Sequence, residues 1–117
     1  MELSALVRAL LAYDTLAVRQ WVADATRAHL EWRCIPAPES LDPVGMAVAA
    51  GVAEVLASRA GQSPPAWTAR VVAAPEPIFL VRAAAEMPRL RRSCEEDGPE
   101  PLRRRGVYAP PEFLTAA

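Results

Sequence analysis

The N-terminal part of the chain repeats apolar residues at the spacing of two helices. Four of them recur at i, i+3, i+4 and i+7, which places them on one helix face. These are Leu3, Leu6, Val7 and Leu10. A second apolar stripe follows Asp14, whose carboxylate is a good N-cap. Its members are Val18, Trp21, Val22, Ala25, His29 and Trp32. Because the break between the stripes is short, the pattern predicts two helices packed as an antiparallel or sharply angled pair.

The middle of the chain carries the clearest helix signals. Asp42 is suited to cap a helix, Pro43 to occupy its first position and Gly61 to follow its last turn. Between them, valines form an apolar ridge, while alanines and a glycine keep the other faces small enough for neighbouring helices to approach closely. We therefore expect a buried central helix, with Glu54 and Arg59 at its only hydrated end.

The second half is rich in proline, which is excluded from helix interiors and central strands. The β-branched stretch 71–81 predicts extended chain or very short strands. A short helix is expected within 82–96, limited by Pro88, and a helical turn within 102–105, ending at Gly106. After two further prolines, Phe113 and Leu114 should turn inward and anchor the tail, because each gains about 1.5–3 kcal/mol from burial.

These elements predict a mainly α fold: a compact helical domain with a buried central helix and a proline-rich, loop-rich second half. A length of 117 residues favours a single domain, residues 1–117. Apolar residues make up 52% of the chain and charged residues 23%, as in ordinary globular proteins. Such a domain can bury enough surface to fold without a disulfide or a metal.

Charge and cysteine content limit the cellular compartments and the classes of partner that fit this chain. The net charge is −1, so no overall field attracts nucleic acid or an anionic membrane. No apolar run is long enough to span a bilayer. Cys34 and Cys94 are far apart and follow no signal peptide, so we expect free thiols and a cytoplasmic protein. No cofactor is indicated.

The stretch LRRRGVY (Leu102 to Tyr108) is the candidate partner-binding site, with Arg103, Arg104, Arg105 and Tyr108 as its residues. Guanidinium groups bind carboxylates and phosphates through paired hydrogen bonds. The six arginines between residues 89 and 105 are matched by six acidic residues between residues 86 and 112, so a solvated surface of internal ion pairs is the competing interpretation. In both interpretations the three arginines should stay at the surface, because a buried guanidinium needs a partner.

Catalytic and metal-binding patterns are weak. His29, Cys34 and Cys94 could supply at most three metal ligands, without paired spacing, and His29 falls on an apolar stripe. The five glycines are scattered and form no phosphate loop. We therefore expect no enzyme activity, no catalytic residues and no metal site. The first two helices could instead form a helix-turn-helix, but the outward face of the second mixes basic and acidic residues.

The segments SPPAWTARV, EPIFLVRAA and PEPLRRRGVYAPPEFLTAA, all from Ser63 onward, carry a family resemblance. Together with YDTLAVRQWVADA they resemble small bacterial proteins found beside nucleotidyltransferase-fold toxins. The resemblance implies an antitoxin-like accessory protein that binds the neighbouring enzyme.

The leading hypothesis is therefore a non-enzymatic protein-binding module, the antitoxin-like partner of a nucleotidyltransferase-like toxin enzyme. The alternative is a small DNA-binding transcriptional regulator that uses the first two helices. The sequence is also compatible with a homo-oligomer.

Overall fold

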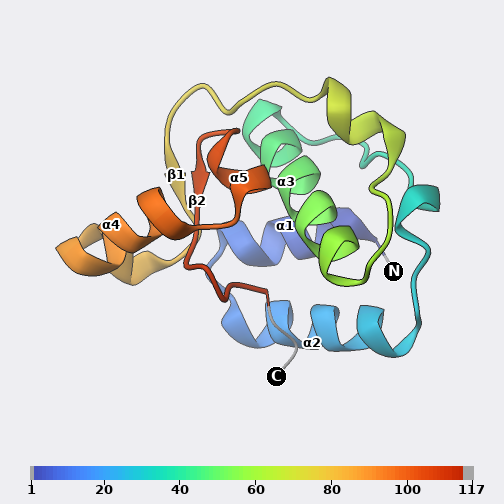
Figure 1. Cartoon of the computed structure of the whole chain (residues 1–117), viewed down its shortest axis with the longest axis horizontal. Coiled ribbons are helices and arrows are strands. Elements are labelled where there is room, and N and C mark those ends of the chain that lie inside the picture. Colours follow the sequence, from blue (N-terminus) through green and yellow to red (C-terminus); the bar gives the residue numbers. More distant parts are fainter. Residues whose placement is uncertain (1, 115–117) are drawn as a thin grey trace.

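Two N-terminal helices form a hairpin, as the apolar spacing predicts. A computed structural model describes residues 2–114, with helix α1 at Leu3–Leu11 and α2 at Thr15–Arg27. The four predicted apolar residues of α1 are buried, and Asp14 caps α2 by accepting a hydrogen bond from the amide of Ala17 at 3.1 Å. In Figure 1 the two helices run nearly side by side, with α2 below α1.

The second apolar stripe is shorter than predicted. Helix α2 ends at Arg27, and His29 has a positive φ of 50° and an exposed side chain, so it does not continue the stripe. The chain then enters the 3₁₀ helix η1 (Trp32–Cys34), where Trp32 is buried and packs against the Trp21 ring at 6.2 Å between centroids.

Helix α3 (Pro43–Arg59) is the buried central helix that the sequence predicts. Its cap is confirmed, because the Asp42 carboxylate accepts a hydrogen bond from the amide of Gly45 at 2.7 Å. At the other end Gly61 takes a left-handed φ of 70°, and the amide of Gln62 closes the last turn on the Ala57 carbonyl at 2.8 Å. All residues from 47 to 57 are buried.

The second half consists of short elements, several of which pack on α3. They are the 3₁₀ helices η2 (Ala66–Arg70) and η3 (Arg82–Ala85), helices α4 (Pro88–Asp97) and α5 (Glu100–Arg103), and strands β1 (Ile78–Phe79) and β2 (Val107–Tyr108). Helix α4 extends away from α3 at the left of Figure 1. Pro88 starts a helix instead of interrupting one. The strands pair in parallel, Ile78 with Val107 and Phe79 with Tyr108, and the second strand was not expected from the sequence.

The fold is mainly α, 58% helical with 4% strand. Within residues 2–114, no helix is both long enough and apolar enough to cross a membrane.

Helix α5 lies against α3 at a glycine. A Cβ added to Gly51 would come within 2.5 Å of Leu102 Cδ2 and 3.3 Å of Leu102 Cα. The small residues of α3 thus permit the close approach that the sequence indicates.

The tail is anchored by Leu114, which is buried as predicted, whereas Phe113 is only half-buried. Arg59 of α3 holds the tail by donating hydrogen bonds to the carbonyls of Phe113 and Pro111. The tail therefore lies between α2 and α3 (Figure 1).

Replacing Asp42 with alanine should lower the free energy of unfolding by about 1 kcal/mol, because the Gly45 amide loses its acceptor. Urea unfolding followed by circular dichroism should show a lower midpoint with the same denaturant slope. Glu39→Ala, at an exposed position just before the helix, is the matched control and should leave the midpoint in place. An unchanged midpoint for Asp42→Ala would mean that α3 does not depend on this cap.

Candidate protein-binding surface

The four predicted site residues lie on α5, the turn after it and β2, but in different surroundings. Arg103 and Tyr108 are half-buried and Arg104 is exposed. Arg105 is only 4% exposed. The prediction that all three arginines stay at the surface is therefore wrong for Arg105, which cannot contact a partner from this position.

Arg105 is buried because Glu54 of α3 pairs with it. Its Nη1 and Nη2 donate to Oε1 and Oε2 of Glu54 at 2.6 and 3.2 Å. Nη1 also donates to the Pro101 carbonyl and Nη2 to the Thr68 carbonyl, each at 2.9 Å. All four Nη hydrogens are thereby used, while the buried Nε has no hydrogen-bond partner in the described part of the chain. Glu54, expected at a hydrated helix end, is only 8% exposed.

The charge of Glu54 is maintained by these contacts. Burial by itself raises the pKa of this carboxyl, since it disfavours the charged form. The hydrogen bond from Arg105 and the positive charges of Arg105 and Arg104 act in the opposite direction and outweigh burial. The net result is a pKa below the usual value of 4.5, so Glu54 is ionised at neutral pH.

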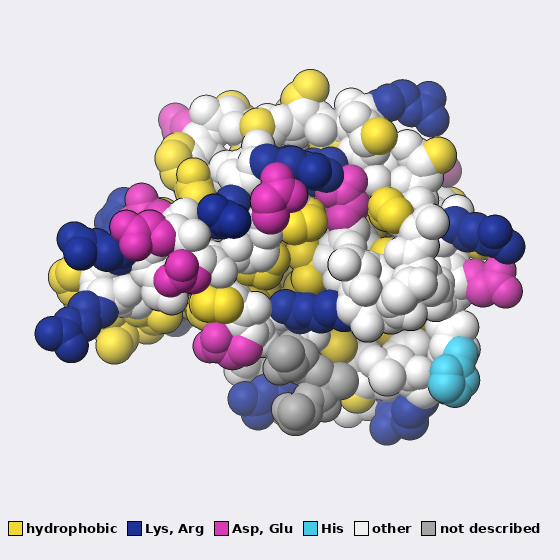
Figure 2. Space-filling model, viewed as in Figure 1, with side chains coloured by type: hydrophobic (Ala, Val, Ile, Leu, Met, Phe, Trp, Pro, Cys, Tyr) yellow, Lys and Arg dark blue, Asp and Glu magenta, His cyan; other side chains and the backbone are white. Residues whose placement is uncertain are grey.

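Arg104 and Arg103 are also engaged within the molecule. Arg104 contacts Glu54 and lies 3.4 Å from the carboxylate of Glu100. Arg103 Nε donates to the Gly98 carbonyl at 2.6 Å. Figure 2 shows basic and acidic side chains next to one another over α4 and around α5. This arrangement fits the competing interpretation of internal ion pairs.

Tyr108 contributes to a layered aromatic contact. Its ring packs on Phe79, its partner in the parallel strand pair, at 5.2 Å between centroids. The guanidinium of Arg91 from α4 lies 4.9 Å from the centroid of Phe79. The strand pairing thus places Tyr108 in a contact that ties α4 to the sheet.

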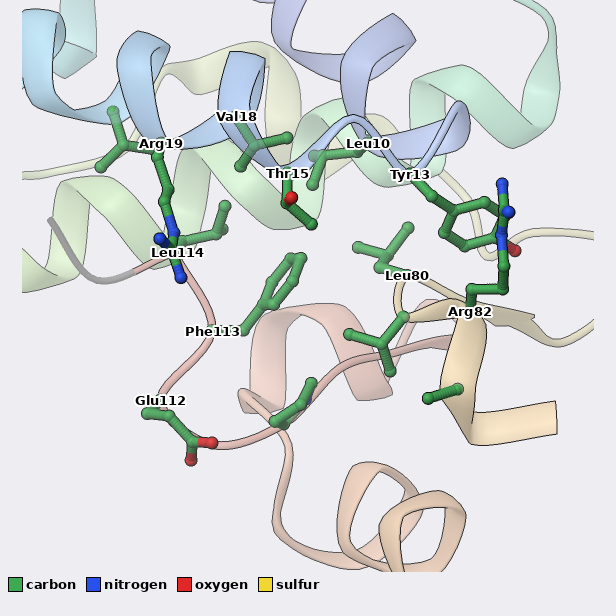
Figure 3. Close-up of a pocket in the computed structure, with 14 residues that line it drawn as sticks. Leu10, Tyr13, Thr15, Val18, Arg19, Leu80, Arg82, Glu112, Phe113 and Leu114 are labelled. Atoms are coloured by element: carbon green, nitrogen blue, oxygen red, sulfur yellow. The ribbon is translucent and has the colours of Figure 1, made fainter. Parts of the chain in front are cut away.

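A cavity of about 570 Å³ opens between the N-terminal hairpin and the C-terminal tail. Four segments line it: the end of α1, the first half of α2, the chain around residues 80–83 and residues 110–114. Its apolar wall includes Leu10, Val18, Leu80 and Phe113, with the Phe113 ring directed into the space (Figure 3). This volume lies within the range of cavities that bind ligands.

Exposed apolar side chains occur on the α1–α2 junction, adjacent in the chain to the cavity-lining residues Leu10, Tyr13 and Thr15. Leu16 is 77% exposed, Tyr13 40% and Leu11 38%. Tyr13, held at a φ of 57°, donates its hydroxyl to the Phe79 carbonyl at 3.4 Å. The Arg82 guanidinium lies 5.0 Å from the centroid of its ring. We call Leu11, Tyr13 and Leu16 the junction patch.

Sequence reasoning missed both the cavity and the junction patch. One signal was available, because Leu16 is a large apolar residue that does not fall on the buried stripe of its helix. The cavity itself left no local signal, since its walls come from four separate parts of the chain.

The residues considered for metal or thiol chemistry do not converge. Among residues 2–114, no group of three His, Cys, Asp or Glu side chains could hold a metal ion. Cys34 is exposed and Cys94 is buried, and both are free thiols, as predicted. Burial raises the pKa of the Cys94 thiol, and the nearby Glu112 carboxylate acts in the same direction. Cys94 is therefore a packed side chain within α4 and not an activated nucleophile.

Comparison with known proteins identifies no relative: no family model matches the chain, nor does any curated protein or solved structure.

Replacing Arg105 with alanine should lower the free energy of unfolding by about 3–5 kcal/mol, because Glu54 would be left as a buried charge without its principal partner. Arg104→Ala removes a guanidinium that contacts the same carboxylate from an exposed position and should cost at most about 1 kcal/mol. Denaturant unfolding of the two variants gives the comparison. Equal losses would show that burial does not distinguish the two ion pairs.

The Glu54 pKa also predicts a pH dependence. Since the folded-state pKa lies below the unfolded value, the stabilising contribution is complete above about pH 4.5 and is lost as the pH falls through the folded-state pKa. The difference in unfolding free energy between the wild type and Glu54→Gln should therefore be constant near neutral pH and shrink in acid. A difference that stays constant down to acid unfolding would contradict the assigned ion pair.

Proposed function

We propose that this protein is a non-enzymatic protein-binding module. The observation that carries the proposal is the junction patch, three exposed large apolar side chains on the α1–α2 junction, of which Tyr13 also lines the cavity of about 570 Å³. A partner that covers Leu16 would gain about 1.5–3 kcal/mol from the burial of this side chain alone. Tyrosine, arginine and a concave apolar pocket are also the usual features of the energetically dominant part of a protein interface.

For the partner we propose a nucleotidyltransferase-like toxin enzyme, to which this chain would act as an antitoxin-like subunit in the cytoplasm. The support for this identity is the resemblance of the segments from Ser63 onward. Two free thiols, one of them exposed, are in keeping with a reducing compartment.

A protein partner is preferred to DNA because of the polar face of α2. Asp24 accepts a hydrogen bond from Gln20 at 2.8 Å and forms an ion pair with Arg27. The Asp24 carboxylate thus engages Gln20 and Arg27, two residues that a recognition helix would need to present to a phosphate backbone or to base edges. A net charge of −1 offers no long-range attraction to DNA.

The test uses two exposed apolar residues of nearly equal exposure, Leu16 at 77% and Val72 at 75%. The tagged protein would be co-expressed with the products of the genes adjacent to its own and purified, and the complex analysed by size-exclusion chromatography. We expect a stoichiometric complex with the wild type and with Val72→Asp. Leu16→Asp should bind about 10- to 100-fold more weakly, as expected for losing the burial of one leucine.

Two outcomes would contradict the proposal. The first is that no stoichiometric protein partner is found among the neighbouring gene products or in the source cell. The second is that Leu16→Asp, shown by circular dichroism to be folded, binds its partner as tightly as the wild type does.

A further inference from the structure

The charges around the cavity are unevenly distributed. Arg19 and Arg82 lie at its edge, together with the carboxylate of Glu112. Figure 3 shows Arg82 beside the Tyr13 ring at one side, and Arg19 and Glu112 at the opposite side. None of the ion pairs formed within residues 2–114 includes Arg82 or Arg19. The side of the cavity next to the junction patch therefore carries a positive charge without a nearby acidic lining residue.

Arg82 is also held in place. Its guanidinium lies 5.0 Å from the centroid of the Tyr13 ring, and the Tyr13 hydroxyl is itself bonded to the Phe79 carbonyl. A guanidinium stacked on an aromatic face keeps its N–H groups directed outward in its own plane. Because Arg82 is partly ordered before binding, it would lose less side-chain entropy when it pairs with an anion.

We infer that the cavity and the junction patch bind an acidic segment of the partner protein. A bulky apolar side chain of that segment fills the cavity, and a neighbouring carboxylate pairs with Arg82. This inference rests on the proposed protein-binding function and adds the chemistry of the segment that is recognised.

A protein segment fits the surface better than a small molecule does. Leu16 and Leu11 are not among the residues that line the cavity. A ligand confined to the cavity would leave both exposed, whereas a segment that inserts one side chain and continues over the α1–α2 junction would cover them. The combination of an apolar anchor and a flanking charge is typical of the way short segments dock in grooves.

The probe is a random peptide library displayed on phage and selected against the immobilised full-length protein. We expect enriched peptides to carry an aromatic residue or leucine next to Asp or Glu. Synthetic copies, measured by fluorescence anisotropy, should bind Arg82→Glu at least about tenfold more weakly than the wild type and should weaken as salt is raised. Arg82→Lys keeps the charge and Arg33→Glu reverses a charge at an exposed residue of η1, so both should bind within a few-fold of the wild type.

Several results would overturn the inference: no enriched peptide, enriched peptides without acidic residues, or equal affinity for Arg82→Glu and the wild type. The failure of the proposed function would look different. A native partner that requires Leu16 but binds Arg82→Glu with full affinity would overturn the acidic-segment inference and leave the protein-binding function standing. A native partner that binds Leu16→Asp with full affinity would contradict the binding surface proposed above.

Discussion

Glu54 and Arg105 form a bidentate ion pair inside the protein, and this pair holds α3, η2 and α5 together. Glu54 belongs to α3, and the Arg105 guanidinium also bonds the carbonyls of Thr68 in η2 and Pro101 in α5. A buried ion pair of this kind contributes little net stability compared with apolar packing, but an arrangement that leaves either charge unpaired is strongly disfavoured. The pair thereby specifies how η2 and α5 sit on the central helix, and β2 follows directly from that position.

The composition of α3 makes this arrangement sterically possible. The helix is built largely from alanine, valine and glycine, so its surface is nearly smooth and gives little information about register. At Gly51 the backbone of α5 comes close enough that Leu102 occupies the space of a missing side chain. Small residues allow the approach. Glu54, three residues before Ala57, the last buried residue of α3, selects one orientation of α5 through its pairing with Arg105.

Features that depend on neighbouring residues could be predicted from the sequence. The buried face of α1, the Asp14 and Asp42 caps and the glycine after α3 are all encoded within one or two helical turns. Features that depend on distant residues could not. Glu54 and Arg105 are 51 positions apart, so each alone resembles an ordinary surface charge. The same holds for the pairing of Phe79 with Tyr108, because a two-residue parallel strand has no pattern of its own. The cavity depends on four such distant segments.

The tail forms one wall of the cavity, and this determines when the cavity can form during synthesis of the chain. Residues 110–114 form one wall, and Arg59 retains them there. The helical hairpin and α3 emerge first from the ribosome and can begin to pack. The cavity does not exist until residues 110–114 have left the ribosome and reached α2. Contacts made across so long a stretch of chain form late, because closing the intervening loop costs entropy before any packing repays it. A growing chain therefore lacks the cavity, and a partner that needs the cavity can bind only a chain that has been synthesised beyond residue 114.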